Sequence, residues 1–308
     1  MTGVDVCTAY LYGKLGEEIY MCQPEGFIAR GQESKVICLK RALYGLKQAG
    51  LAWWKELSNS MKDLGFARLN LDGKIFVCQE GTRLIVAVVY VDDAMFFSKN
   101  KKLVKKKKAL IMAKWECQDL GDVKEFLCMH ITHTRTGITI DQCDYLEKVL
   151  TRFQLTDTKA AITPLPTNWE PKANTGKAMA AEITCYQSII GSLLYLMIGT
   201  HPDIAFTVTH LSQFSTNLTE DHYRAAQHVC CYLVGTCNYK LVYYTHEEDK
   251  GLVAYTDSDW AADKIWRRSI TGYFFKLANG IISWRSHTQK TVALFSMEAE
   301  YMAISNCS

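Results

Sequence analysis

Three carboxylates stand in apolar surroundings, where their charge calls for an explanation. Asp5 lies between two valines, and Asp92 and Asp93 follow the β-branched run Leu84–Tyr90. Two unit charges about 4 Å apart repel by about 4 kcal/mol at an effective dielectric constant near 20. Protonation, ion pairing or a divalent cation removes that repulsion. Mg²⁺ takes oxygen ligands, often one or two carboxylates plus substrate phosphates, and a pair of such ions suits nucleotidyl transfer.

A plain hairpin turn is the alternative explanation for Asp92 and Asp93, because aspartate is common in turns. The run Leu84–Tyr90 predicts a strand covered on both faces, and Ala94–Phe97 predicts a second short strand. The short spacing predicts a tight hairpin with both aspartates at or beside its turn. Composition and spacing alone favour the plain turn over a metal site.

A second acidic pair, Asp257 and Glu300, lies in the C-terminal part of the chain, where the pattern changes to strands. The expected strands are Leu252–Thr256, Thr271–Leu277 and Gly280–Arg285. Asn279-Gly280 predicts a hairpin turn between the last two. Ser296 is a suitable N-cap for a final helix that carries Glu300.

Helices are expected in several segments between Asp5 and Asp257, because apolar residues recur there at helical spacing. The expected helices are Leu39–Met61, the Lys-rich segment through Trp115, Asp144–Phe153, Cys185–Met197, Asp203–Thr216 and Asp221–Val234. A turn and two strands are expected within Asp119–Ile140. Thr163–Gly176 holds three of the five prolines and is the expected linker. The longest apolar run, Ile189–Ile198, is shorter than the ~20 residues of a membrane span, so we expect no membrane partner.

Net charge and metal-ligand residue types restrict the function only weakly. The formal net charge is +3, but seven lysines gather within residues 99–108. A solvated helix face and a phosphate-contacting face that releases counterions are both open for this block. The 12 cysteines include no Cys-x-x-Cys pair, which predicts reduced thiols in a cytosolic or nuclear protein. His130 and His133 would lie on opposite faces of a strand, which favours structural roles.

Several motifs resemble reverse transcriptases. Tyr90-Val91-Asp92-Asp93 resembles the signature tetrad of that family, and Val4-Asp5-Val6 followed by Ala9-Tyr10-Leu11 resembles its first palm motif. Four segments follow the order found in copia-type LTR retrotransposon Pol polyproteins, so the resemblance covers essentially the whole chain. They are DVCTAYLYGKLGEEIYMCQPEGF (5–27), LYGLKQAG (43–50), THPDIAF (200–206) and AEYMA (299–303).

The resemblance implies an α+β fold in three parts. Residues 1–155 would form a reverse transcriptase palm with an antiparallel sheet, together with the start of the thumb. Residues 156–250 would form a mostly helical thumb and connection. Residues 251–308 would form the N-terminal part of a ribonuclease-H-like α/β domain.

The resemblance also implies an RNA-directed DNA polymerase that joins dNTPs to a primer 3′-hydroxyl. Asp5, Asp92 and Asp93 would be the catalytic triad and would hold two Mg²⁺ ions, for which Mn²⁺ could substitute. Tyr10 matches the aromatic gate against a ribose 2′-hydroxyl. Gln48 matches a glutamine beside the incoming nucleotide, although a polar residue at a helix end explains it nearly as well. The implied partners are an RNA template and the primer duplex, in a cytoplasmic virus-like particle or the nucleus.

The ribonuclease-H-like part rests on AYTDSDWA (254–261), with Asp257 and Glu300 as shared magnesium ligands. The family's remaining carboxylates would follow Ser308, and its fingers subdomain would precede Asp5. We therefore expect this ribonuclease H site to be inactive. The alternative to a polymerase is a catalytically inactive relic or a co-opted protein that binds nucleic acid or another partner.

Several residues depart from the copia pattern. Cys128 stands where glycine is usual, and His201 and Cys231 stand where arginine is usual. Phe295 and Met297 replace serine and threonine. Each of the last four changes can arise from a single C-to-T substitution, so we hypothesise a decaying element copy. Comparison of the nucleotide sequence with close element copies tests this, and no excess of such substitutions would refute it.

Overall fold

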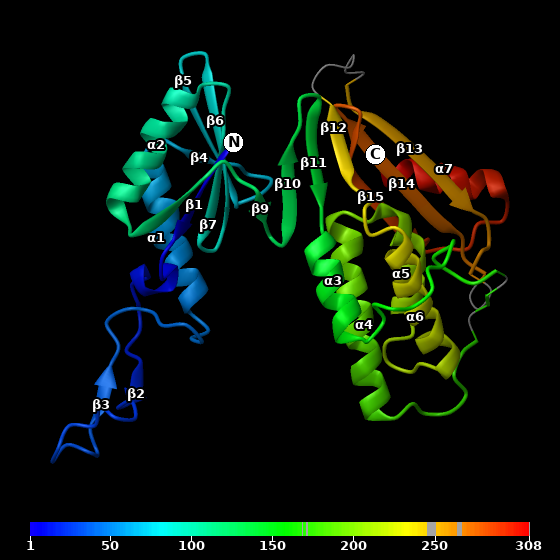
Figure 1. The fold of residues 1–308 in the computed structure, drawn as a ribbon, viewed down its shortest axis with the longest axis horizontal. Helices are drawn as coiled ribbons and strands as arrows, with labels where there is room; N and C mark the ends of the chain where they lie inside the picture. The colour runs from blue at the N-terminus through cyan, green and yellow to red at the C-terminus, as the bar shows by residue number, and fades with distance from the viewer. Residues whose placement is uncertain (168, 171, 245–250, 264–266, 308) are drawn as a thin grey trace. The chain divides into compact units, whose positions relative to one another are not determined.

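The computed structural model describes every residue except 168, 171, 245–250, 264–266 and 308 (Figure 1). The chain forms two compact units, Met1–Val123 and Lys124–Ser308. The first contains Asp5, Asp92 and Asp93, and the second contains Asp257 and Glu300. The three-part division implied by the resemblance stays a prediction.

The first unit is built on a six-stranded antiparallel sheet in the order β4-β5-β6-β7-β1-β8. Because β1 lies between β7 and β8, it is the direct neighbour of the β6–β7 hairpin. The strands are β1 (Thr2–Val6), β4 (Ala67–Arg68), β5 (Ile75–Glu80), β6 (Arg83–Tyr90), β7 (Asp93–Phe97) and β8 (Cys117–Gly121).

Helices α1 (Ala49–Asp63) and α2 (Lys101–Lys114) pack on one face of this sheet (Figure 1). In β6, Ile85 and Ala87 are fully buried on that face, whereas Leu84 is 50% exposed. The prediction that this strand is covered on both faces is therefore wrong. An antiparallel sheet can leave one face open, and the described residues supply helices for one face only.

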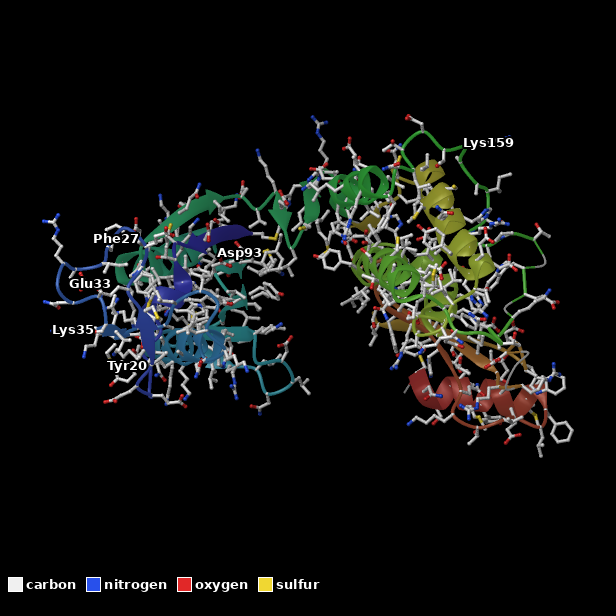
Figure 2. All side chains as sticks on the ribbon, turned by 90° about the horizontal axis from the view of Figure 1, so that it is seen from below. Tyr20, Phe27, Glu33, Lys35, Asp93 and Lys159 are labelled. Carbon is white, nitrogen blue, oxygen red and sulfur yellow. The ribbon has the colours of Figure 1, made fainter. Side chains whose placement is uncertain are left out.

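The expected helix over Leu39–Met61 is also shorter than predicted. The segment before Ala49 forms successive turns, and Gly45 has φ +91°, a conformation that ends regular helix. A hairpin of β2 (Tyr20–Cys22) and β3 (Val36–Cys38) extends away from the sheet of the first unit (Figure 1). Tyr20 and Phe27 lie along this extension, where Figure 2 labels them.

The lysine block of residues 99–108 does not form a uniformly exposed helix face, which was one of its two expected structures. Lys107 is buried, donating to the Leu64 carbonyl at 2.7 Å and pairing with Glu80 at 2.8 Å. Lys108 is also buried and pairs with Asp119. The other lysines of the block are exposed: Lys99, Lys101, Lys102, Lys105 and Lys106. Two of the seven lysines thus stabilise the fold, and five face solvent.

The second unit combines helices with two antiparallel sheets, ordered β12-β11-β10-β9 and β13-β14-β15. Its helices are α3 (Cys143–Arg152), α4 (Ala180–Gly199), α5 (Ala205–Ser212), α6 (Glu220–Gly235) and α7 (Ser296–Cys307). Its strands are β9 (Glu125–Phe126), β10 (Met129–His133), β11 (Gly137–Asp141), β12 (Leu241–Tyr244), β13 (Val253–Asp259), β14 (Ile270–Leu277) and β15 (Gly280–Thr288). The helices expected after residue 140 are therefore present.

Helix α4 is long and apolar enough to cross a membrane by length and composition, which the shorter run Ile189–Ile198 did not predict. Its Tyr186, Ile189 and Leu193 are fully buried and belong to the core formed by α3 to α6. This packing buries one face of α4, and the absence of a membrane partner stays a prediction.

The described part of the proline-rich segment Thr163–Gly176 packs on the helices of the second unit. The Thr163 carbonyl lies 3.0 Å from His228 Nε2 on α6. Asn174 Nδ2 donates to the Leu218 carbonyl at 2.6 Å, and Trp169 packs against the helical core. The linker prediction is wrong because apolar and amide side chains hold the described part of this segment in place.

Cys128, which stands where glycine is usual, lies in a turn with left-handed backbone conformation. Leu127 and Cys128 join β9 to β10 as a two-residue hairpin turn, with φ of 51° and 55°. Positive φ at both positions is the pattern that favours glycine. We expect Cys128→Gly to raise the free energy of unfolding of the second unit by about 1 kcal/mol, measured by urea unfolding. An equal gain from glycine at exposed Cys185, inside α4, would contradict this explanation.

The second predicted turn is displaced by one residue. Strands β14 and β15 do form a hairpin, but Leu277 pairs with Gly280, so Ala278 and Asn279 are the central residues. Both have positive φ. Gly280 serves a different purpose, because a Cβ there would lie 2.4 Å from the Tyr243 ring. The glycine permits close packing on β12.

Two buried histidines in the second unit predict a dependence of stability on pH. His210 and His222 are 7% and 0% exposed, and both contact the Trp169 ring. Burial lowers the pKa of each, opposed by Asp263 for His210 and by Asp221 for His222. His210 lowers the pKa of His222 further.

Stability should therefore be full above the unfolded-state pKa of about 6.5 and fall as the pH drops through the lower folded pKa. Each histidine contributes a slope of at most about 1.4 kcal/mol per pH unit. Urea unfolding of the second unit between pH 8 and 5 measures this loss. His210→Leu should reduce the slope, and exposed His133→Gln should leave it unchanged. An unchanged slope in His210→Leu would refute the assignment.

Candidate functional site

The sheet of the first unit places Asp5 directly opposite Asp93. The two residues are Cα partners across the antiparallel β1–β7 pair. Residues opposite one another project to the same face, with Cβ atoms typically about 4.5–5.5 Å apart. The neighbours of Asp5 in β1, Val4 and Val6, are buried in the core, so alternation places Asp5 on the open face. Like charges in this position repel.

Asp92 occupies the turn that joins β6 to β7, as the sequence predicted. Tyr90 pairs with Asp93, so Val91 and Asp92 are the central residues of a two-residue hairpin. The backbone N–H of Val6 donates to the Asp92 carbonyl at 2.9 Å. This bond ties the turn to the end of β1, beside Asp5.

The turn is strained at Val91. Its φ is +55°, a left-handed conformation that is unusual for a β-branched residue. Such strain persists only where surrounding contacts hold it, and it is frequent at functional sites. Here Trp53 Nε1 donates to the Val91 carbonyl at 2.6 Å. Trp53 is 2% exposed and packs edge-on against Trp115, so a rigid core residue sets the position of the turn.

Tyr10 and Tyr44 form an aromatic pair near the carboxylates. Their ring centroids lie 4.7 Å apart. Burial raises the pKa of the Tyr44 hydroxyl, and the charges of Asp92 and Asp5, together with Tyr10, raise it further. Asp5 on β1 and Asp92 in the β6–β7 turn therefore both influence the Tyr44 hydroxyl.

The charge of Asp5 also affects the Cys117 thiol on the adjoining strand β8. Burial raises the pKa of the Cys117 thiol to about 11, with smaller contributions from Cys7 and Asp5. This thiol is therefore protonated at neutral pH.

Gln48 was predicted to lie beside the incoming nucleotide. Its contacts instead favour the alternative of a polar residue at a helix end. It is exposed at the N-terminal end of α1, and its Nε2 donates to Glu17 Oε2 at 3.3 Å. A polar residue at a helix end was the competing interpretation. Its role beside a nucleotide stays a prediction.

The carboxylates of Asp5 and Asp92 fit a magnesium site whose remaining ligands come from the substrate. Among the described residues, no three His, Cys, Asp or Glu side chains are grouped so as to hold a metal by themselves. Mg²⁺ commonly binds one or two carboxylates, several waters and substrate phosphates. Asp5 on the open sheet face and Asp92 in the adjoining turn would supply two such carboxylates, and substrate phosphates and water would complete the ligand set.

The structure brings Asp257 and Glu300 to neighbouring residues of β13 but on opposite faces of the strand. The backbone N–H of Ser258 donates to Glu300 Oε1 at 3.3 Å. Gln289, which donates to the Ala299 carbonyl of α7, also donates to Ser258 Oγ at 3.2 Å, so the Ser258 side chain faces α7. Alternation places Asp257 on the opposite face, where it lines a cavity of about 510 Å³. A shared magnesium ion at this pair stays a prediction.

Sequence reasoning missed the support for the turn. Tyr44 lies within the quoted segment LYGLKQAG, but its proximity to Asp5 and Asp92 depends on the turns before α1. Trp53 is buried in the core. Its hydrogen bond to Val91 joins residues 38 positions apart and has no local sequence signal.

Comparison with known proteins finds similar sequences along nearly the whole chain. Residues 1–167 match the family model described as reverse transcriptase (RNA-dependent DNA polymerase). The chain is 38% identical over 97% of its length to the retrovirus-related Pol polyprotein from transposon TNT 1-94 of Nicotiana tabacum, and 35% identical over 99% to that from transposon RE1 of Arabidopsis thaliana. It is also 32% identical over 98% of its length to a Ty5-1 transposon protein of Saccharomyces cerevisiae.

The chain covers very different fractions of the lengths of these relatives. The chain spans 23% of the tobacco polyprotein and 21% of the Arabidopsis one, but 98% of the yeast protein. The resemblance to copia-type Pol polyproteins is thus confirmed along nearly the whole chain.

Proposed function

Because this chain belongs to the reverse transcriptase family, we propose that its first unit is the palm of an RNA-directed DNA polymerase and catalyses nucleotidyl transfer from dNTPs to a primer 3′-hydroxyl. The observation that carries the proposal is that the three aspartates converge at the adjoining ends of the interior strands β1 and β7. Asp5 lies opposite Asp93 across β1 and β7, and the Val6 amide holds the Asp92 turn against β1.

Asp5 and Asp92 would hold magnesium together with the phosphates of the incoming nucleotide. Bound Mg²⁺ would supply Lewis-acid stabilisation of the charge that develops on the phosphoryl oxygens. The chain's own contribution is to fix two carboxylates on a rigid sheet before substrate arrives. Asp93, opposite Asp5, adds negative charge that strengthens the attraction for a cation. Mn²⁺ is the expected substitute ion.

Tyr10 is placed to act on the sugar of the nucleotide. It lies in a short 3₁₀ helix, η1 (Ala9–Tyr12), directly after β1, and its ring packs against Tyr44. A ring held in this way beside Asp5 and Asp92 would exclude a ribose 2′-hydroxyl by its bulk. The partners that follow are a primed RNA template and dNTPs.

Primer extension on an oligo(dT)-primed poly(A) RNA template tests the proposal, with Mg²⁺ or Mn²⁺ and either dTTP or UTP. We expect metal-dependent extension with dTTP and much less with UTP. Folded protein that extends no primer with either metal would refute polymerase activity of this chain and favour the inactive relic. Equal use of UTP would refute the role of Tyr10 alone.

A further inference from the structure

A groove rich in positive charge lies in the first unit, at the end of the β6–β7 hairpin opposite the Asp92 turn. Its volume is about 920 Å³. It is lined by Arg83, Leu84, Phe97, Lys99, Lys101 and Lys102, among others. We propose that this groove binds the phosphate backbone of single-stranded nucleic acid, at a site separate from the carboxylates.

The cations of the groove are available for a ligand. Arg83, Lys99, Lys101 and Lys102 form no ion pair within the described residues, and no acidic residue lines the groove. Glu80 pairs in the hairpin with Arg83, but its carboxylate is bound by Lys107 at 2.8 Å, which lowers the pKa of Glu80.

The neighbouring groove provides a contrast. It has a volume of about 370 Å³ and contains Lys101, Lys105 and Lys108, but also Asp119 and Asp122. Lys108 is bound to Asp119 there. The fold therefore uses some lysines of the block internally and leaves the larger groove with uncompensated positive charge.

The apolar residues of the larger groove favour nucleic acid over an acidic peptide. Phe97 is half-buried at the end of β7, and Leu84 is 50% exposed. Proteins that bind single strands without sequence preference combine cations for the backbone with aromatic side chains for the bases. Carboxylate side chains of a peptide would satisfy the cations but would leave this apolar surface exposed.

The position of the groove allows one strand to reach both sites. Asp93 and Phe97 begin and end β7, and Lys99 follows two residues later. At about 3.4 Å per residue, the groove lies roughly 14–20 Å along the strand direction from the Asp92 turn. A stacked strand with about 3.4 Å per nucleotide covers that distance in roughly four to six nucleotides.

The test measures binding of an unprimed, fluorescein-labelled 25-nucleotide poly(U) RNA by anisotropy, in EDTA and without dNTPs. Catalysis is absent under these conditions, so failure of the polymerase proposal does not affect the result. The test variant replaces Arg83, Lys99 and Lys102 with alanine. A matched control removes three exposed lysines elsewhere in the same unit: Lys35, Lys55 and Lys62.

We expect the groove variant to bind about tenfold more weakly, and its plot of log K against log [salt] to be less steep by about 2, since each lost phosphate contact removes about 0.7. The control should change the affinity less than threefold. Equal losses in the two variants would overturn the proposal in favour of dispersed charge. Displacement of the RNA by poly(Glu) as readily as by unlabelled poly(U) would overturn it in favour of an acidic peptide.

Correct folding of the variants is checked by circular dichroism. If the triple variant does not fold, Lys99→Glu provides the same test, because Lys99 is exposed and lies outside the helices and strands. That single change should weaken RNA binding and flatten the salt dependence, and an unchanged affinity would overturn the proposal.

Discussion

Asp5→Asn and Asp92→Asn are each expected to lower the rate of primer extension by about a thousandfold, the scale on which preorganised electrostatic groups act in catalysis. Asparagine keeps the size of the side chain and can still occupy the hairpin turn, so the fold should persist. What is lost is negative charge where Asp5 faces Asp93 across the strand pair. A cation bound through carboxylates depends on that charge.

The double variant Asp5→Asn with Asp92→Asn should be little worse than either single variant, because residues that act as one unit are not additive. Single-turnover primer extension measures all three rates. Asp122→Asn, at an exposed residue of the same unit, is the control and should keep the wild-type rate. Single variants that retain more than a tenth of that rate would contradict a shared site.

Trp53→Ala is expected to destabilise the first unit by about 3–5 kcal/mol, the usual cost of removing a buried aromatic side chain. Trp53 is 2% exposed and contacts Trp115 and Tyr12. It also holds the Val91 carbonyl at the strained turn. A loss of that size is a large part of the stability of an ordinary domain, and urea unfolding measures it.

Trp53→Phe separates packing from positioning. Phenylalanine preserves much of the buried ring but cannot donate to Val91, so the loss in stability should be about 1 kcal/mol. The turn that carries Asp92 should nevertheless loosen, lowering kcat for primer extension about tenfold with little change in KM. Trp54→Phe, at the next residue, is the control. Equal kinetic effects of the two changes would show that Trp53 is merely structural.

The local geometry around Asp92 could be predicted from sequence because its causes are local. A β-branched run and a short apolar run separated by three residues leave room only for a tight turn, and the pairing of Tyr90 with Asp93 confirms it. The meeting of Asp5 with this hairpin is different. It depends on β1 inserting between β7 and β8, a contact between residues nearly 90 positions apart, so only the family resemblance indicated it.

Other features escaped prediction for the same physical reason. Lys107 and Lys108 belong to the lysine block for which a solvated or a phosphate-contacting face was expected. Both are instead buried in ion pairs, because their partners Glu80 and Asp119 lie on distant strands. Proline content suggested a linker, whereas Trp169 packs against the helical core. In each case a distant contact outweighs the local propensity of the segment.

The central claim is that Asp5 and Asp92 together hold the metal ions of nucleotidyl transfer. Its most direct test is Mn²⁺ binding, measured by electron paramagnetic resonance, to the protein with a dideoxy-terminated primer on RNA and the next dNTP, so that no turnover occurs. We predict two Mn²⁺ ions per wild-type complex in excess of those bound by the primed RNA and dNTP alone, and clear loss of that excess in Asp5→Asn and in Asp92→Asn. The same excess in wild type and both variants would contradict the claim.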